Sequence, residues 1–303
     1  MDRFSEIETF VSVAEAGGFN AAARALGRSA PSVTRIVAGL EGRIGTRLFN
    51  RTTRQVALTE VGRRLLEDAR RILDDLATAE ASAAGAHQDP QGLLTVTAPV
   101  MFGRLHIAPI LHRFMDQHPA VTARMIFVDR VVNLIDEGID IAVRIGDLPD
   151  SSLTALRVGD VRRCVVASPE YLARSGRPDH PQALEAHRIA IAASLSPPRS
   201  WDFLSEDATI TVPIRPALSS NSVDASIDAA LSGWALTRAL SYQVADHLKR
   251  GNLVEVLPEF ETRRLPVHLV HAEGRLRAAK IRAFLDMAST ELRRKAHGWI
   301  APG

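Results

Sequence analysis

The segment SAPSVTRIVAGLE, Ser29 to Glu41, has the pattern of a helix with a sharply defined start. Ser29 is suited to cap this helix, and Pro31 is tolerated because N–H groups of the first turn have no partner within the helix. An apolar stripe follows at helical spacing and consists of Val33, Ile36, Val37 and Leu40. With that stripe packed inward, the residues that face outward are Ala30, Ser32, Thr34 and Arg35.

Two further helices are expected before this one. The first has an apolar stripe of Ile7, Phe10, Val11 and Ala14 and ends at the glycines 17 and 18. Asn20 is suited to cap the second, AAARAL, which stops at Gly27. Only two residues then separate it from Ser29. Two short helices joined by a glycine-containing turn of this length form a helix-turn-helix, whose second helix enters the major groove of DNA.

The segment RLFNRTTRQVALT follows the third helix and contains two short apolar-polar runs around NRTTR. This pattern predicts a β-hairpin, or wing. Arg51, Thr52 and Arg54 at its tip are placed to reach backbone phosphates.

Basic residues concentrate in the same part of the chain. From Arg24 to Arg64 there are nine arginines against two acids, and the three lysines of the chain lie elsewhere. Guanidinium groups bind phosphate oxygens bidentately, so the patch favours a nucleic-acid partner. A solvated helix face is the alternative that the sequence leaves open.

A long helix is expected after Thr59, which can cap it. Its apolar residues alternate steps of four and three and are Leu65, Ala69, Ile72, Leu76, Ala79 and Ala83. Such a heptad seam favours pairing with a second copy of the helix, and packing on its own domain remains the alternative. The segment GAHQDPQG, rich in glycine and polar residues, then has the composition of a linker.

The stretch from FVSVAEAGGFNAAARALGRSAPSVTRIVAGLE through GRIGTRLFNRTTRQVALTEVG resembles the DNA-binding domain of LysR-type transcriptional regulators. The resemblance implies that Ser29, Ser32, Thr34 and Arg35 face DNA and that residues 51–54 form the wing. Many members of the family carry glutamine where this chain has Ala30. Because glutamine reads adenine bidentately and alanine offers only a methyl group, contact with a thymine methyl or recognition of DNA shape gains weight here.

From Leu93 onward, short β-type runs alternate with helical ones. The runs at 93–100, 121–127 and 139–146 read as strands, and those at 105–118 and 131–138 read as helices. Strand–helix–strand repetition predicts a largely parallel sheet flanked by helices. The layout resembles the family's two-lobed, periplasmic-binding-protein-like regulatory domain, with the chain crossing between lobes near residues 160 and 265.

Ligands of α/β sheets collect beyond the carboxyl ends of the strands. This places a candidate effector cleft at Pro99, Val100, Met101, Phe102, Arg144, Ile145, Ser194, Asn221 and Ser222. Three alternatives stay open: Arg144 pairs with an acid, Asn221 caps the helix that follows it, and Met101 with Phe102 fills core.

Several kinds of chemistry have no support in the sequence. Metal-binding HExxH or CxxC motifs, a GxSxG nucleophile elbow and glycine-rich phosphate loops are all missing, so we expect no metal, no cofactor and no enzymatic activity. The single cysteine, Cys164, lies in an apolar run and is expected to be buried. No apolar run reaches the length of a membrane span and the N-terminus does not resemble a signal peptide, so we expect a cytoplasmic protein without a membrane partner.

Together these patterns predict an all-α winged helix-turn-helix domain at residues 1–59, a linker and dimerisation helix at 60–88, and a two-lobed α/β domain at 89–303. Lobe I is expected at about 89–160 and 266–303, and lobe II at about 161–265. The function expected is sequence-specific binding to double-stranded promoter DNA, controlled by a small-molecule effector, in a homodimer; larger assemblies such as tetramers are implied by resemblance only. The alternative is an α/β protein that binds or transforms a small molecule, with N-terminal helices that serve assembly.

Overall fold

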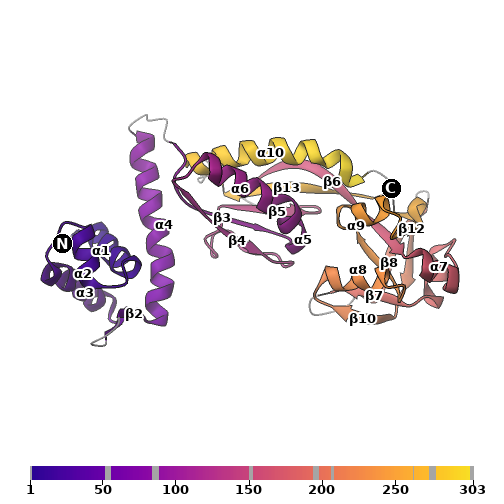
Figure 1. Cartoon of the computed structure of the whole chain (residues 1–303), viewed down its shortest axis with the longest axis horizontal. Helices are drawn as coiled ribbons and strands as arrows, with labels where there is room; N and C mark the ends of the chain where they lie inside the picture. Colours follow the sequence, from indigo (N-terminus) through magenta and orange to yellow (C-terminus); the bar gives the residue numbers. More distant parts are fainter. Residues whose placement is uncertain are drawn as a thin grey trace. The chain divides into compact units, whose positions relative to one another are not determined.

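Two units make up the chain in the computed structural model (Figure 1), namely residues 1–92 with 277–279, and residues 93–276 with 280–303. The structure describes residues 2–51, 56–83, 89–149, 153–193, 198–205, 208–261, 263–272 and 278–300.

The N-terminal unit contains helices and one short hairpin. Its elements are α1 (Arg3–Glu15), α2 (Phe19–Ala25), α3 (Ala30–Ile44), β1 (Phe49–Arg51), β2 (Val56–Leu58) and α4 (Glu60–Ala83). Its core brings the buried face of α3 together with Phe10 of α1 and Phe49 of β1, whose rings lie 5.4 Å apart. The predicted helix-turn-helix with a following wing is therefore the architecture of this unit.

Two of the three helix caps that the sequence predicts in this unit, Ser29 and Thr59, are confirmed. The Ser29 hydroxyl accepts a hydrogen bond from the N–H of Ser32 at 3.4 Å, and the Thr59 hydroxyl accepts one from the N–H of Gly62 at 2.9 Å. The predicted cap at Asn20 is wrong. Helix α2 already begins at Phe19 without a side-chain cap, because the ring of that residue packs against Phe49 at 5.6 Å and draws the first turn into the core.

The second unit contains a mixed sheet and a separate hairpin. Its strands are β3 (Gly92–Ala98), β4 (Val121–Phe127), β5 (Ile141–Ile145), β6 (Leu153–Ala167), β7 (Ile189–Ala192), β8 (Ser200–Ser205), β9 (Ala208–Pro213), β10 (Pro216–Ser220), β11 (Leu236–Leu240), β12 (Val254–Val256) and β13 (Arg264–Ala272). Within the described residues the sheet has the order β10-β7-β11-β6-β13-β5-β3-β4, with β12 paired to β6, and β8 pairs only with β9.

Strand β6 is shared by two lobes of this unit. Its first part pairs with β13, next to β5, β3 and β4, which form the first lobe; its last part pairs with β11 and β12 in the second lobe, which also contains β7 and β10. The prediction of a largely parallel sheet is wrong. Parallel pairs occur within each lobe, as in β3 with β5 and β10 with β7. Among the described residues every pairing of β6 and of β13 is antiparallel, because the chain leaves the first lobe along β6 and returns to it along β13.

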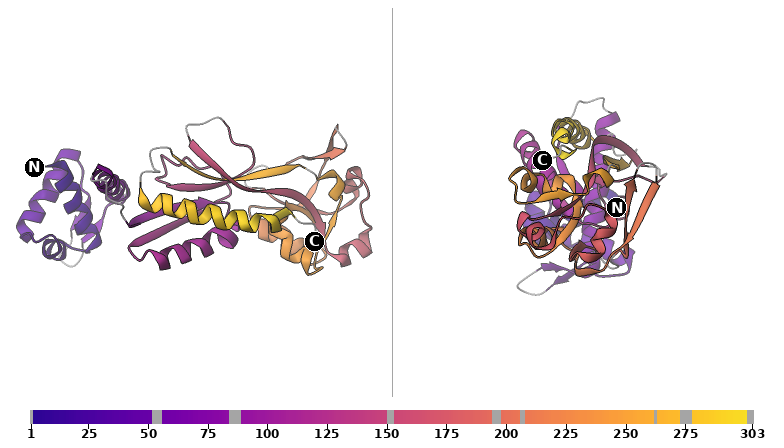
Figure 2. Two further views of the ribbon diagram at one scale, coloured as in Figure 1. Left: turned by 90° about the horizontal axis from the view of Figure 1, so that it is seen from above. Right: turned by 90° about the vertical axis from the view of Figure 1, so that its right-hand side faces the viewer.

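Helices surround these strands (Figures 1 and 2). They are α5 (Val100–Phe102), the π-helix η1 (Gly103–Ile107), α6 (Ala108–Gln117), α7 (Pro169–Ser175), the 3-10 helix η2 (Pro181–Ala186), α8 (Val223–Leu231), α9 (Ser241–Lys249), the 3-10 helix η3 (Pro258–Phe260) and α10 (Ala279–Ile300). In Figure 2, α10 runs along the strands. It approaches β6 closely, since a Cβ atom on Gly159 would lie 2.9 Å from the Trp299 ring.

The prediction of a helix at 131–138 is also wrong. The segment forms turns instead, in which the Asn133 side-chain oxygen accepts from the N–H groups of Ile135 and Asp136. Asparagine side chains compete in this way with the helical hydrogen-bond pattern. Val132 and Leu134 are buried in this arrangement, and Val131 is exposed.

Cys164 is buried, as predicted. Among the described residues, no helix combines the length and the apolar character that crossing a membrane requires.

The glycine at the start of α4 yields a test of the N-terminal packing. A Cβ on Gly62 would lie 2.1 Å from the carbonyl oxygen of Leu48, so Gly62→Ala must displace backbone and is expected to lower the free energy of unfolding by about 2 kcal/mol. A Cβ on Gly42 in α3 meets nothing within 4 Å, and Gly42→Ala is expected to stabilise by about 0.5 to 1 kcal/mol. Thermal unfolding of both variants measures this; equal shifts of the two would contradict the packing described.

Candidate nucleic-acid interface and effector site

Helix α3 presents a defined outer face because its inner face is fully packed. Val33, Ile36, Val37 and Leu40 are all buried, as the periodicity predicts. The helix ends at Gly45, whose φ of 79° is accessible to glycine at little cost. Its rotation about its own axis is therefore fixed by the core.

The outer face of α3 is more uneven than the sequence suggested. Arg35 is exposed and, within the part of the chain that the structure describes, forms no ion pair. Ser29 is exposed, whereas Ser32 and Thr34 are half-buried, and the Thr34 hydroxyl donates to the carbonyl of Ala30 at 2.9 Å. Ala30 itself was expected to point outward, but it is half-buried and packs against the core of the unit, because the first turn lies close to the other helices.

Two arginines of the basic patch bind other side chains of the N-terminal unit. Arg28 lies in the turn between α2 and α3 and donates to the hydroxyls of Ser5 and Thr9 on α1, at 3.1 and 3.3 Å. Arg43 pairs with the buried Glu6 at 2.7 Å. These contacts tie α3 and its turn to α1, so the sequence count of nine arginines overstates the charge available to a partner.

The wing is anchored to α3 through a carboxylate. The Glu41 side chain accepts from the N–H groups of Leu48 and Phe49 at 2.8 and 3.2 Å, immediately before the strand pair β1–β2. Arg51 pairs with Val56 in that hairpin. Thr52 and Arg54 lie outside the described residues.

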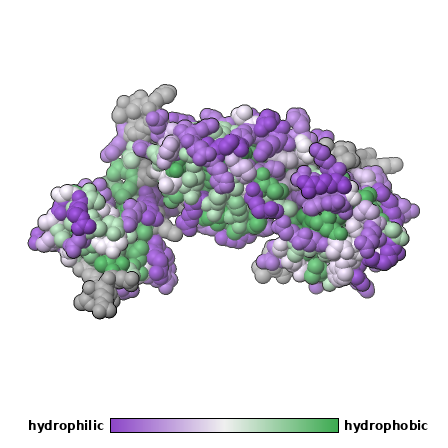
Figure 3. Space-filling view, viewed as in Figure 1, coloured by the Kyte–Doolittle hydropathy of each residue, from purple (hydrophilic) through white to green (hydrophobic). Residues whose placement is uncertain are grey.

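The predicted heptad seam of α4 is divided between two environments. Ala69 is fully buried and Leu65 packs with it against the core of the N-terminal unit, so the own-domain alternative holds for these two residues. Ile72 is 39% exposed, Ala79 is exposed and Leu76 is half-buried. Ala83 ends the helix. Figure 3 shows apolar surface along the C-terminal half of α4.

The effector-site residues predicted at the end of β3 differ in burial. Met101 and Phe102 are buried, and the Phe102 ring packs against Tyr242 and Trp299 at 5.2 Å each, so the core-filling alternative holds for this pair. Val100 is 40% exposed, and its N–H donates to Asp129 at 3.0 Å. Pro99 is half-buried and immediately precedes α5.

The other predicted effector residues also have individual roles. Arg144 is half-buried, and its guanidinium donates a hydrogen bond to the carbonyl of Val132 at 2.9 Å. The partner is therefore a backbone carbonyl and not the acid that the alternative expected. Ser222, rather than Asn221, caps α8, because its hydroxyl accepts from the N–H of Ala225 at 3.3 Å. Asn221 is exposed and Ile145 is half-buried. Ser194 lies outside the described residues.

Two models of known families match the chain. The one described as bacterial regulatory helix-turn-helix protein, lysR family, matches residues 4–63, and the one described as LysR substrate binding domain matches residues 87–293. The chain belongs to the LysR family of transcriptional regulators. It is a DNA-binding regulator and not an enzyme.

Relatives of this LysR-type regulator match over nearly the whole chain. An HTH-type transcriptional repressor of Pseudomonas aeruginosa is 33% identical and covers 94% of this chain and 91% of its own length. The structure of CrgA from Neisseria meningitidis matches with a TM-score of 0.62 and 33% identity, over 95% of this chain and 98% of CrgA. The Vibrio cholerae virulence activator AphB, 24% identical, shares the fold with a TM-score of 0.60 over 95% of this chain and 98% of its own.

Two ion pairs of the LysR-type regulator connect its lobes, and no pattern in the sequence predicted them. Arg104, in the π-helix after β3, pairs with Asp224 at the start of α8 at 3.1 Å. Arg263, just before β13, pairs with Asp147, just after β5, at 2.8 Å. The partners are 120 and 116 residues apart in the sequence, so no local spacing could reveal them.

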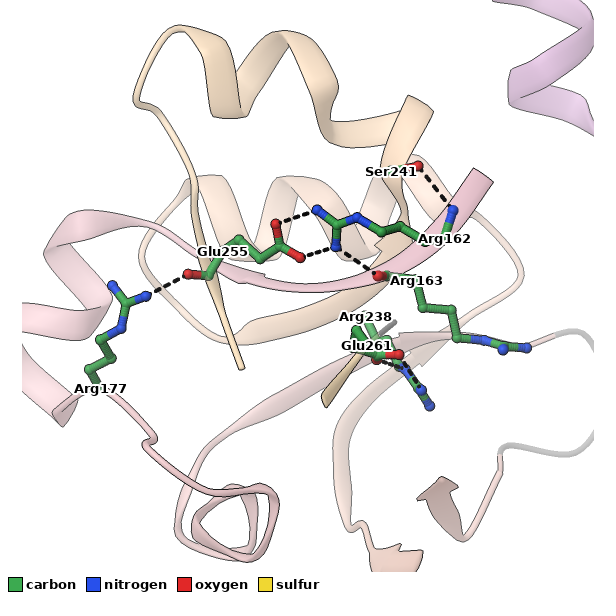
Figure 4. Close-up of polar contacts among 7 residues, drawn as sticks. All are labelled: Arg162, Arg163, Arg177, Arg238, Ser241, Glu255 and Glu261. Carbon is green, nitrogen blue, oxygen red and sulfur yellow. Dashed lines mark hydrogen bonds and ion pairs between the residues drawn. The ribbon is translucent and has the colours of Figure 1, made fainter. Parts of the chain in front are cut away.

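A second set of ion pairs is buried in the second lobe of the LysR-type regulator (Figure 4). Arg162 pairs bidentately with Glu255, and Arg238 pairs bidentately with Glu261. Burial raises the pKa of Glu261, while its hydrogen bonds to Arg238 lower it. Arg238 also lies over the Phe203 ring at 4.8 Å, which holds the guanidinium in place.

Removing one cation from a buried pair and from an exposed pair is expected to destabilise the protein to different extents. Arg238→Met leaves the carboxylate of Glu261, 5% exposed, without its partner and is expected to lower the free energy of unfolding by about 3 kcal/mol. Arg263→Met breaks a pair whose side chains are 62% and 74% exposed and is expected to cost less than about 1 kcal/mol. Denaturant unfolding of both variants measures the difference, and similar losses would contradict the burial assigned to the Arg238 pair.

Proposed function

We propose that α3 is the helix of this regulator that enters the major groove, with Arg35 as its main phosphate-contacting side chain. The observation that carries the proposal is that Arg35 is an exposed cation without an ion-pair partner in the described part of the chain, on a helix whose rotation is fixed by four buried residues. The neighbouring contacts that we assign to DNA are Ser29, Ser32 and Thr34.

The outer face of α3 has only small side chains with which to recognise the DNA bases. Ala30 is half-buried and offers a methyl group, so its contribution is limited to contact with a thymine methyl. Recognition of DNA shape and deformability then carries more of the specificity. For the wing we assign Arg51, Thr52 and Arg54 to backbone phosphates, on the basis of residue type and order in the sequence.

We further assign the C-terminal half of α4 to pairing between two copies of the chain. Ile72, Leu76, Ala79 and Ala83 continue the heptad pattern beyond the point where Leu65 and Ala69 pack on their own domain. Two paired chains would present two α3 helices to half-sites about one helical turn, or a multiple of it, apart. The corresponding boundaries are a DNA-binding domain at 1–59, a linker and dimerisation helix at 60–88 and a regulatory domain at 89–303.

The regulatory domain is proposed to bind its effector between the two lobes. Support comes from the exposed Val100 and Asn221 at the ends of β3 and β10, and from ion pairs that cross between the lobes. A ligand that prefers one arrangement of the lobes shifts the regulator toward it by no more than its differential affinity. The regulator meets its DNA in the cytoplasm.

Replacing Arg35 by alanine tests the role of α3. Because one phosphate contact is lost, binding to DNA from the region flanking its own gene is expected to weaken, and the slope of log affinity against log salt to decrease in magnitude by about one. Fluorescence anisotropy at several salt concentrations measures both. Arg282→Ala, which removes an exposed arginine from α10, is the matched control and is expected to keep the slope. An unchanged slope in a folded Arg35→Ala variant would refute the role.

A charged residue in the middle of the proposed pairing surface tests the role of α4. Ile72→Asp brings two carboxylates together across a two-fold axis and is expected to halve the molar mass of the assembly in solution. Ala77→Asp places the same charge at another exposed position of α4 and is expected to leave the mass unchanged. Light scattering coupled to size-exclusion chromatography provides the measurement; retention of the full mass by Ile72→Asp would exclude pairing through this surface.

A further inference from the structure

The connection between α3 and the wing is organised around one residue, Glu41. Its backbone carbonyl accepts from the N–H groups of Gly45 and Thr46 at 2.9 and 3.2 Å, which closes the end of α3. Its side-chain oxygen Oε1 accepts from the N–H groups of Leu48 and Phe49 at 2.8 and 3.2 Å. One residue of α3 therefore binds the backbone along the whole connection to the first strand of the wing.

The N–H groups of Leu48 and Phe49 depend on this acceptor. Both residues are buried, with exposed fractions of 0% and 2%. Buried backbone N–H groups are nearly always paired, and a charged acceptor gives stronger hydrogen bonds than a neutral one. Without the carboxylate of Glu41, the start of β1 would have to shift until water or another oxygen reached these groups.

The start of α4 holds the other side of the peptide group that joins Leu48 to Phe49. The carbonyl oxygen of this group accepts from the N–H of Thr59 at 2.9 Å, and a Cβ on Gly62 would lie 2.1 Å from the same oxygen. The first strand of the wing is therefore bound by α4 on one side and by α3 on the other. Because the buried face of α3 fixes its rotation, the carboxylate of Glu41 fixes the strand relative to the outer face of α3.

We propose that Glu41 is a positioning residue for DNA binding, which holds the wing where the wing and α3 contact the same duplex at once. It acts through the backbone of Leu48 and Phe49 rather than through a phosphate, which a carboxylate repels. Groups that are held in place before binding lose less freedom on binding. This inference rests on the proposed DNA contacts of α3 and of the wing.

Hydroxyl-radical footprinting of the full chain tests the proposal on DNA from the region flanking its own gene, with every variant at a saturating concentration. Arg54→Ala first identifies the phosphates that the wing protects, and Arg35→Ala those that α3 protects. Glu41→Asp keeps the charge but is one methylene group shorter, and Glu41→Ala removes the acceptor. Both are expected to lose the wing protection and to keep that of α3.

Glu41→Gln keeps an acceptor oxygen at full length and is expected to retain both sets of protected phosphates. The slope of log affinity against log salt is expected to decrease in magnitude by about two in Glu41→Asp, because the contacts of Arg51 and Arg54 are lost together, and to stay unchanged in Glu41→Gln. If Glu41→Ala does not unfold cooperatively, the contrast between Glu41→Asp and Glu41→Gln decides alone.

Val13→Ala controls for a loss of stability without a change at the wing. Val13 is a fully buried residue of α1, and its truncation is expected to lower the melting temperature and leave the footprint intact. Wing protection that persists in Glu41→Asp, or that is lost from Glu41→Gln or Val13→Ala as well, would overturn the role of Glu41 and leave the assigned DNA contacts standing. If Arg51→Ala and Arg54→Ala remove no protection, the proposed contacts of the wing fail, and this inference fails with them.

Discussion

The packing of one face of α3 determines what the N-terminal unit presents to DNA. Val33 and Val37 are fully buried against the other helices, so rotating α3 would expose them and force Arg35 toward an apolar core. The capping contact of Ser29 fixes where the helix starts, and the buried face fixes its rotation. Position and rotation together leave Arg35 outside, on the face of α3 to which the DNA contacts of this helix are assigned.

In the second unit, β6 has the corresponding role. Its first part belongs to one lobe and its last part to the other, so a change in the angle between the lobes must pass through this strand and through β13 beside it. The buried pair of Arg162 with Glu255 lies on the second-lobe part and joins β6 to β12, which anchors that part of β6 within the second lobe. The exposed pairs Arg104–Asp224 and Arg263–Asp147 each contribute little to stability, so they would oppose a change in the angle between the lobes only weakly.

Local patterns in the sequence predicted the features that local physics determines. The buried stripe of α3 and the caps at Ser29 and Thr59 followed from spacing over a few residues. The family followed from the resemblance of the whole N-terminal stretch to LysR-type regulators. Asn20 failed as a cap because a tertiary contact of Phe19 decided where α2 begins, and the helix predicted at 131–138 failed because the Asn133 side chain bonds to the backbone there. The direction of β13 and the pairs between lobes depend on residues more than a hundred positions apart, which no local pattern encodes.

The arginines also show that position in the sequence does not reveal the surroundings of a side chain. In the sequence, Arg28 and Arg43 count toward a basic patch together with Arg35. The first is held by hydroxyls and the second by Glu6, whereas Arg35 is exposed and has neither a hydrogen bond nor an ion pair from its guanidinium among the described residues. Arg162 and Arg163 are adjacent on one strand and have different surroundings, because successive side chains of a strand point to opposite faces. An arginine contributes to the fold where a carboxylate or carbonyl lies within reach, and it is available to a ligand where none does. The density of basic residues in the sequence therefore does not show which arginines hold the fold together; the partners within reach of each guanidinium do.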